Sequence, residues 1–186
     1  MSLQPHSIVD LDRLAPYYRP PMLMLGATGS AVPEYPEARD YFGKWVGSEY
    51  QDLDLDGGDL RLDLNTDIGL SQTHGCVFNL GTIEHVWNAH VAWSNALRAV
   101  KVGGYFLSHG PLNGWVNHGL HMTSEPAIRA FITKNGFEIV ARFTSKWKTQ
   151  GEVLWLAAHK LRHIEAIDDF QPALQVYEAG QKKAVE

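Results

Sequence analysis

The fold of this chain is decided by residues 76–140, CVFNLGTIEHVWNAHVAWSNALRAVKVGGYFLSHGPLNGWVNHGLHMTSEPAIRAFITKNGFEIV. The stretch begins within a short apolar run, residues 75–80, which is typical of a strand buried on both faces. From Val86 to Val100 the apolar side chains recur at helical spacing, which predicts an amphipathic helix. Gly103-Gly104 is a stop signal, so we expect the helix to end before it.

The same order of strand and helix then repeats. Tyr105-Phe106-Leu107 predicts a strand, and Ser124 followed by Pro126 is a typical helix start, with Gly136 as the stop. Apolar residues occupy every second position from Phe137 to Phe143, as in a strand. Strands that alternate with helices predict right-handed crossovers and a largely parallel sheet.

The last two predicted strands break this order. Residues 152–159 should form the final strand, and only residues 144–151 separate it from the strand before it. That connection is too short for a crossover helix, so the two strands should form an antiparallel hairpin.

Three further strands are expected upstream. Met22-Leu23-Met24-Leu25 is a short apolar run that ends at the loop Gly26–Ser30. Trp45-Val46-Gly47 indicates a second strand near 44–50, and Leu60–Leu64 indicates a third, after the turn signal Gly57-Gly58.

Composition limits the architecture and the partners. A chain of 186 residues, 45% apolar and 20% charged, is about one domain, and its single cysteine, Cys76, excludes an internal disulfide. The net charge of −5, without a dense cluster of Lys and Arg, argues against nucleic acid as a partner. The first residues lack the order of a signal peptide, and the longest apolar run, Val153–Ala158, is far shorter than a membrane span. We expect a cytoplasmic protein without a membrane partner, divided into a lead-in (1–20), one domain (21–161) and a tail (162–186).

A ligand should bind at one edge of the predicted sheet, because open α/β sheets bind ligands beyond the carboxyl ends of their strands. Gly26 and Gly29 would let the backbone approach such a ligand closely. Glu49, or Asp54 if its strand runs longer, could accept hydrogen bonds from both hydroxyls of a ribose, and Asp63 could accept one from an exocyclic amine. The loops expected at this edge are Gly26–Ser30, Glu49–Asp54, Asp63–Asp67, Asn79–His85 and His109–His121.

Phe78-Asn79-Leu80-Gly81-Thr82-Ile83-Glu84-His85-Val86 resembles the fourth-strand segment of class I S-adenosylmethionine-dependent methyltransferases, in which a hydrophobic strand runs into a leu-glu-his-val helix start. Residues 97–104 resemble the family's arg-val-leu-lys-pro-gly-gly turn before strand five, with Val102 where the family has proline. Residues 123–140 resemble the next helix and the gly-phe start of strand six. The resemblance covers residues 22–160. It implies an α/β fold, a Rossmann-like three-layer sandwich whose mostly parallel seven-stranded sheet has an antiparallel C-terminal strand.

The resemblance also implies S-adenosylmethionine as the cofactor. The family's first loop carries an acidic residue and three alternating glycines, whereas this chain has Met24 in the acidic position and matches only the first glycine in register. The methionine part of the cofactor would lie against Gly26, Ala27, Thr28 and Gly29, and the ribose beside Glu49 and Tyr50. The adenine would be held by Asp63 and Leu64, and the wall facing the substrate would be Asn79, Leu80 and Gly81.

Methyl transfer needs alignment of the two reactants, and a hydroxyl acceptor also needs a base, for which histidine is the usual choice. The candidate bases are His109, His118 and His85. The acceptor would contact Asn113, Trp115, Asn117 and His121, while Trp87 and Trp93 are expected in the core. His118 and His121 are three residues apart and His109 is near, but this spacing does not establish the ligands of a zinc site, so we predict no metal.

Three functions remain open. The first is an S-adenosylmethionine-dependent methyltransferase that modifies oxygen or nitrogen of a small-molecule or sugar-type substrate. The second is an inactive methyltransferase-like module for binding or assembly, which a first loop that fills the cofactor pocket would favour. The third is an NAD(P)-dependent Rossmann enzyme, against which the predicted hairpin and the lack of a Gly-x-Gly-x-x-Gly loop speak.

Overall fold

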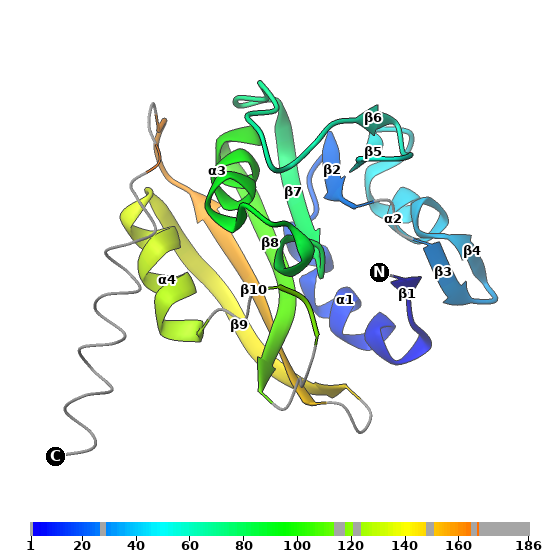
Figure 1. The fold of residues 1–186 in the computed structure, drawn as a ribbon. Helices are drawn as coiled ribbons and strands as arrows, with labels where there is room; N and C mark the ends of the chain where they lie inside the picture. Colours follow the sequence, from blue (N-terminus) through cyan, green and yellow to red (C-terminus); the bar gives the residue numbers. More distant parts are fainter. Residues whose placement is uncertain are drawn as a thin grey trace, which may run out of the picture.

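The computed structural model describes residues 2–26, 29–113, 118–120, 124–147, 151–164 and 167. Its centre is a seven-stranded sheet in the order β6-β5-β2-β7-β8-β10-β9 (Figure 1). Its strands are β2 (Met22–Leu25), β5 (Tyr50–Asp54), β6 (Leu60–Arg61), β7 (His74–Leu80), β8 (Val100–Asn113), β9 (Phe137–Trp147) and β10 (Gly151–Lys160). A smaller sheet in the order β1-β3-β4 consists of β1 (Ser2–Leu3), β3 (Gly29–Val32) and β4 (Tyr35–Glu37).

Helices cover both faces of the large sheet and give the three layers that we expected (Figure 1). One face carries α1 (Ile8–Leu14) and α2 (Ala38–Val46), and the other carries α3 (Ala89–Ala99) and α4 (Glu125–Lys134). Short 3-10 turns are η1 (Pro5–Ser7), η2 (Ala15–Tyr17) and η3 (Ile83–His85).

The strand directions confirm the predicted fold class. The five strands β6, β5, β2, β7 and β8 run parallel, whereas β10 is antiparallel to both β8 and β9. Trp155 in β10 pairs with His109 of β8 on one side and with Phe143 of β9 on the other. The predicted C-terminal hairpin is therefore confirmed, and it closes the sheet.

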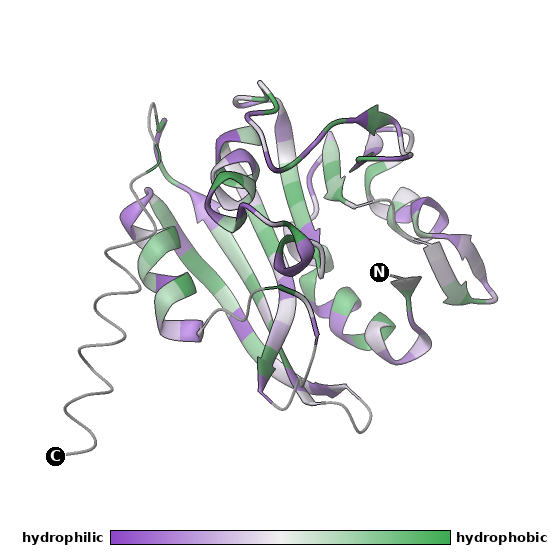
Figure 2. Cartoon of the chain, in the orientation of Figure 1, coloured by the Kyte–Doolittle hydropathy of each residue, from purple (hydrophilic) through white to green (hydrophobic). Residues whose placement is uncertain are grey.

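Alternation along the strands divides the core into two clusters. Met22 and Met24 of β2 pack with residues of α1 and α2, whereas Leu23 and Leu25 pack with residues of α3 and α4. Every residue of β7 is buried, as expected for a strand with both faces covered. Figure 2 shows the hydrophobic residues concentrated along these central strands. The carboxyl ends of the strands lie outside this packed layer, where a ligand can reach them.

The helices on the α3/α4 face begin and end at specific signals. The Ser124 side chain accepts a hydrogen bond from the backbone of Ala127, and Gly136, at φ 77°, follows the end of α4, which confirms both predicted boundaries. The start predicted for α3 at Val86 is wrong. The side chain of Asn88 accepts a hydrogen bond from the backbone of Val91 and caps the helix, which therefore begins at Ala89.

Two expectations are wrong, namely the strand near 44–50 and the core position of Trp87. Trp45 and Val46 belong to α2, in which the apolar positions have helical spacing, and not to a strand near 44–50. The second strand of the fold is therefore β5, at 50–54. Trp87 lies in the connection between η3 and α3 and is 78% exposed, so it is not a core residue. Trp93 is buried in the core as expected.

The first twenty residues pack against the sheet. Leu3, Leu11 and Leu14 are fully buried in the same cluster as Met22, and β1 pairs in parallel with β3. This segment thereby connects the first loop to the face that carries α1. Among the described helices, none has the length and apolar character needed to cross a membrane.

Candidate functional site

A pocket opens at the carboxyl ends of β2, β5 and β6, next to the turn that follows β7. We call it the Gly26 pocket. It has a volume of about 500 Å³, its opening to solvent included. Its lining is apolar apart from two carboxylates, one amide, one hydroxyl and one imidazole, and consists of Gly26, Leu53, Asp54, Leu55, Leu62, Asp63, Leu64, Asn65, Thr82, His85 and Val86. The structure thus brings together four of the residues predicted from sequence, Gly26, Asp63, Leu64 and His85.

Gly26 holds the first loop against the turn after β7. Its backbone N–H donates to the carbonyl of Leu53 at 2.7 Å, and its φ of 82° favours glycine. A Cβ atom at this position would overlap the hydroxyl oxygen of Thr82, which donates to the carbonyl of Leu25 at 2.6 Å. The close approach of these two segments therefore requires glycine and leaves backbone exposed to the pocket.

The two carboxylates of the Gly26 pocket stand at neighbouring strand ends. Asp54 is the last residue of β5, and its Oδ1 accepts from the backbone of Asp56 at 3.1 Å. Asp63 follows β6, and its Oδ1 accepts from both the backbone and the side chain of Asn65 at 2.8 Å. These hydrogen bonds hold the pKa of Asp63 below its ordinary value, the backbone bond more than the side-chain bond. No lysine or arginine belongs to the described lining, so the pocket is acidic.

A buried asparagine of α3 fixes the loop that carries Leu64. Asn95 donates through Nδ2 to the carbonyl of Thr66 at 2.7 Å and to that of Leu64 at 3.4 Å. Its Oδ1 accepts from the backbone of Ile68 at 3.4 Å. The amide thus satisfies three backbone groups of a loop that has no regular secondary structure, and this fixes one wall of the pocket.

Glu49 and Tyr50 lie at the opposite edge of the sheet from the one predicted. Glu49 precedes β5 and its carbonyl accepts from the backbone of Met22 at the start of β2, so it marks the amino ends of both strands. Tyr50 is buried and stacks on Phe42 of α2. The expectation that the second strand ends at Glu49 is wrong because that strand begins there. Asp54, the alternative for a longer strand, takes the place beside the pocket.

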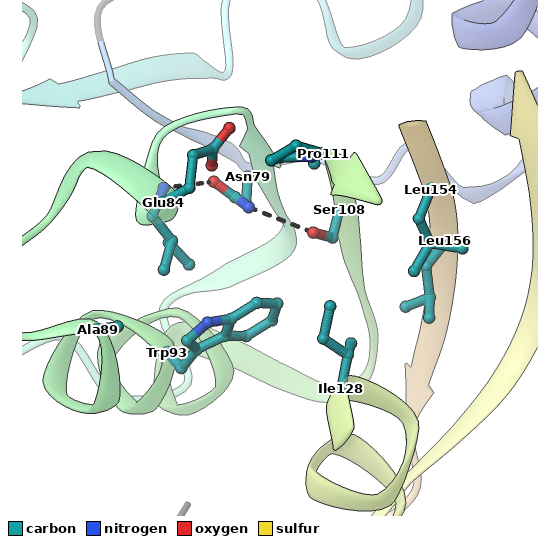
Figure 3. A pocket seen from close by; sticks show the side chains of 11 residues that line it. Asn79, Glu84, Ala89, Trp93, Ser108, Pro111, Ile128, Leu154 and Leu156 are labelled. Carbon is teal, nitrogen blue, oxygen red and sulfur yellow. Dashed lines mark hydrogen bonds between the residues drawn. The ribbon is translucent and has the colours of Figure 1, made fainter. Parts of the chain in front are cut away.

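A second pocket lies between α3 and α4 over β7, β8 and β10. We call it the Trp93 pocket, and its volume is about 490 Å³ with its opening. Figure 3 shows Trp93 and Ile128 facing Asn79 and Ser108 across it, with Leu154 and Leu156 along one side. Asn79 donates to the Ser108 hydroxyl at 3.2 Å. The remaining lining residues are Ile83, Glu84, Ala89, Gly110 and Pro111.

Three ionisable side chains form a group beside the two pockets. Glu84 belongs to the lining of the Trp93 pocket and His85, the next residue, to that of the Gly26 pocket. Nε2 of His118 lies 4.0 Å from Oε1 of Glu84, and its ring centroid lies 5.0 Å from that of His85. Burial raises the pKa of Glu84 to about 7, and burial together with His118 lowers the pKa of His85. Sequence reasoning assigned Glu84 no chemical role, because its burial and its proximity to His118 are seen only in the structure.

His109 lies inside β8 and not at its end. It is 1% exposed, it packs against Trp147 and Trp155, and neither ring nitrogen has a hydrogen-bond partner in the described structure. Burial lowers its pKa to about 3, with smaller contributions from His6 and His118. It lines neither pocket, and an imidazole whose pKa is this low is a poor base at neutral pH.

None of the other described residues predicted for the site lines the Gly26 pocket. Asn79 accepts through Oδ1 from the backbones of Thr82 and Ile83, so it caps η3, and it faces the Trp93 pocket instead of the Gly26 pocket. Leu80 is buried in the core, and the Gly81 backbone donates to the His109 carbonyl. Gly29 belongs to β3, and Asn113 ends β8 with a hydrogen bond to Glu152. The predictions for Ala27, Thr28, Trp115, Asn117 and His121 fall outside the described residues.

Solved structures resemble this chain, although no protein-family model and no curated protein matches it. A candidate methyltransferase from Bacillus halodurans aligns at 12% identity and a TM-score of 0.62, over 83% of this chain and 99% of that one. An S-adenosylmethionine-dependent methyltransferase from Aquifex aeolicus aligns at 13% and 0.52, over 83% and 97%. The chain has the class I methyltransferase fold.

A third structure of this fold was solved with small molecules bound. It is the 1,6-didemethyltoxoflavin-N1-methyltransferase of Burkholderia thailandensis, with 1,6-didemethyltoxoflavin and S-adenosylhomocysteine. It aligns at 14% identity and a TM-score of 0.60, over 85% of this chain and 77% of that one. Identities this low establish the fold of the present chain, and its activity must be argued from its own site.

Proposed function

We propose that this chain is an S-adenosylmethionine-dependent methyltransferase that acts on a small molecule. The observation that carries the proposal is the Gly26 pocket, in which a glycine backbone, two carboxylates and a set of aliphatic side chains meet at the carboxyl ends of β2, β5 and β6. An adenosine-containing cation can use these groups, with apolar side chains against the base and carboxylates that accept hydrogen bonds from the ribose and the amine.

Each part of the cofactor has a matching group in the Gly26 pocket. The carboxylate of Asp54, at the end of β5, would accept hydrogen bonds from the ribose hydroxyls. Leu62, Leu64 and Val86 would enclose the adenine, with Asp63 placed to accept from its amine. The acidic lining would also attract the positively charged sulfonium of the cofactor. When bound, the cofactor supplies an activated methyl group, so the protein needs mainly to align the acceptor.

The Trp93 pocket is the proposed acceptor site. Its wall is largely apolar, with Trp93, Ile128 and Leu156, and Glu84 of its lining is followed in the chain by His85 of the Gly26 pocket. An acceptor with an apolar body and one hydroxyl or amine group fits this lining better than a bare sugar does. Of the bases predicted from sequence, His85 and His118 lie beside the buried Glu84, and we propose them over His109 for accepting the acceptor's proton.

The two alternative functions are less consistent with the same pocket. A nicotinamide dinucleotide brings a pyrophosphate, and two aspartates without a lysine or arginine in the described lining would repel it. For an inactive module, we expected the first loop to fill the cofactor pocket. Of the described residues of that loop, Gly26 lines the pocket, and Gly29 and Ser30 pair with β1 and β4, so none of these three residues fills it.

Calorimetry with S-adenosylhomocysteine tests the proposal. We expect one binding site per chain, and Asp54→Asn should weaken it by about tenfold to a hundredfold, since a hydrogen bond to a charged group contributes about 1.5–3 kcal/mol. Asp56→Asn is the matched control, because Asp56 is an exposed carboxylate in the same loop that does not line the pocket. No binding at millimolar ligand, or equal weakening by both variants, would contradict the assignment.

A further inference from the structure

The group of Glu84, His85 and His118 has the composition of a metal site. One ligand atom from each side chain lies within 4.8 Å of the other two. The set of two imidazoles and one carboxylate is the donor set of many catalytic zinc sites, which keep further positions open for water or substrate. Neither the sequence resemblance nor the comparisons assign a metal here, and the spacing of the three residues in the chain follows no pattern that would have predicted one.

The backbone holds this group together independently of its side chains. The carbonyl of Glu84 accepts a hydrogen bond from the backbone of Leu120 at 2.6 Å, which seats the segment 118–120 on η3. Gly119, at φ 70°, lies so close that a Cβ there would be 2.8 Å from the same carbonyl oxygen. The contact therefore requires glycine at 119, and it places His118 over Glu84 although thirty-three positions separate them in the chain.

Glu84 is the member whose surroundings need an additional partner. It is 7% exposed, and its Oε1 has no hydrogen-bond partner in the described structure. A buried polar atom without a partner is costly, and native structures rarely keep one without a reason. The nearest ionisable groups are His118, whose Nε2 lies 4.0 Å from Oε1, and His85, and one ligand atom of each lies within 4.8 Å of a carboxylate oxygen of Glu84.

We propose that Glu84, His85 and His118 bind a divalent transition-metal ion, zinc or one of similar ligand preference. Ligands of tetrahedral zinc are about 3.4 Å apart, since zinc–nitrogen and zinc–oxygen bonds are about 2.0–2.1 Å long. The side chains must therefore approach one another by about an ångström, which rotation of the exposed His85 and the half-buried His118 allows. Imidazole with one carboxylate favours zinc, iron, nickel or copper over calcium and magnesium.

The position of the ion gives it a role that rests on the proposed function. Glu84 lines the Trp93 pocket and His85 lines the Gly26 pocket, so the ion would have one ligand from the lining of each pocket. An open coordination position there would bind an oxygen of the acceptor and lower the pKa of its hydroxyl group. With the ion bound, His85 and His118 would serve as its ligands, and activation by the metal would take the place of proton uptake by these two imidazoles. The proposal therefore assigns a hydroxyl-bearing acceptor, methylated on oxygen, in preference to an amine.

The test is metal binding by the full chain, prepared without a histidine tag and stripped with a chelator. Calorimetric titration with zinc should show one equivalent bound, and cobalt(II) should give visible absorption bands of the bound ion. Glu84→Gln, which keeps the shape of the side chain, and His118→Ala should each weaken zinc binding by at least about a hundredfold, the upper end of what losing a ligand's supporting partner costs. His163→Ala is the matched control, because His163 is exposed and lies outside the group, and its affinity should be unchanged.

Gly119→Ala provides a second variant that keeps all three ligands. Its side chain would displace the segment 118–120 from the Glu84 carbonyl, so zinc affinity should fall by roughly tenfold while circular dichroism stays that of the folded chain. The proposal is overturned if the unmodified chain binds no zinc or cobalt, or if Glu84→Gln and His118→Ala bind as tightly as His163→Ala. Binding of S-adenosylhomocysteine is measured separately without metal, so failure of the cofactor assignment leaves this result standing, and the reverse also holds.

Discussion

Replacing Gly26 with alanine tests whether the first loop and the turn after β7 depend on each other as the structure indicates. The new Cβ would overlap the hydroxyl of Thr82 and displace it from the Leu25 carbonyl, to which it donates at 2.6 Å. The residue would also remain at a φ of 82°, which disfavours any side chain. Both effects act at the edge of the Gly26 pocket, so stability and cofactor affinity should fall together.

The magnitude follows from three contributions. A residue other than glycine in the left-handed region costs about 1–2 kcal/mol, and losing the Thr82 hydrogen bond costs a further ~0.5–1.5 kcal/mol. The smaller conformational entropy of alanine in the unfolded chain offsets roughly 0.4–1 kcal/mol. The free energy of unfolding should therefore decrease by about 0.5–3 kcal/mol, and each kcal/mol corresponds to a Tm decrease of roughly 2–4 °C in a chain of this size.

Urea denaturation of four proteins measures this coupling: the parent, Gly26→Ala, Thr82→Ala and the double variant. Because Thr82→Ala removes the obstructing hydroxyl, Gly26→Ala should cost about 1 kcal/mol less in that background, well above the ~0.5 kcal/mol expected of independent sites. Gly29→Ala is the matched control, since nothing lies within 4 Å of a Cβ there. The reasoning is refuted if the two single effects simply add, or if Gly26→Ala costs no more than Gly29→Ala.

Two further predictions concern the bases and the acceptor. His109→Phe should move acid denaturation to lower pH. In the folded chain, burial lowers the pKa of His109 to about 3, with smaller contributions from His6 and His118, whereas the unfolded value is about 6.5. The unfolded chain therefore takes up the proton first, and the parent loses about 3 kcal/mol of stability between pH 6.5 and pH 4. An unchanged acid transition would count against the burial of His109, and loss of methyl transfer in a folded variant would restore it as the base. Gly110→Leu should place a side chain in the Trp93 pocket, because a Cβ at this position meets no atom within 4 Å. It should leave the affinity for S-adenosylhomocysteine unchanged and abolish turnover of the acceptor. Equal loss of both would show that the two pockets are not separate.

The fold was predictable where local signals and packing agree. The strand 75–80, the capped helix after Ser124 and the hairpin of residues 137–159 each combine an unambiguous period with a clear boundary, and each was found. Trp45-Val46 failed because a short apolar pair fits either a strand or the end of a helix, and only the burial of Tyr41 and Phe42 in the structure shows the helical period.

The site was predictable only where it depends on strand ends. Gly26 follows a strand that the pattern located, and Asp63 and Leu64 belong to the predicted strand 60–64, which in the structure ends at Arg61, so that all three residues lie at one pocket. Glu49 was misplaced because the second strand was expected to end near residue 50, whereas in the structure it begins there. Glu84 was beyond the reach of sequence reasoning, since its burial and its proximity to His118 arise from a backbone contact between η3 and a segment distant in the chain.

The two carboxylates of the Gly26 pocket follow from an unusually short connection between parallel strands. Only residues 55–59 join β5 to β6, whereas a parallel crossover ordinarily needs a dozen residues or more. The connection suffices because β6 pairs only with the last two residues of β5, so the chain has to return by only about 7 Å. Asp52 and Asp59 hold this loop closed, each side chain accepting from the backbone of the other. The strand ends then lie side by side, so the acidic character of the Gly26 pocket is a consequence of the topology. If the proposed cofactor assignment is correct, lengthening this loop should lower the affinity for S-adenosylhomocysteine even though no residue of the pocket is replaced.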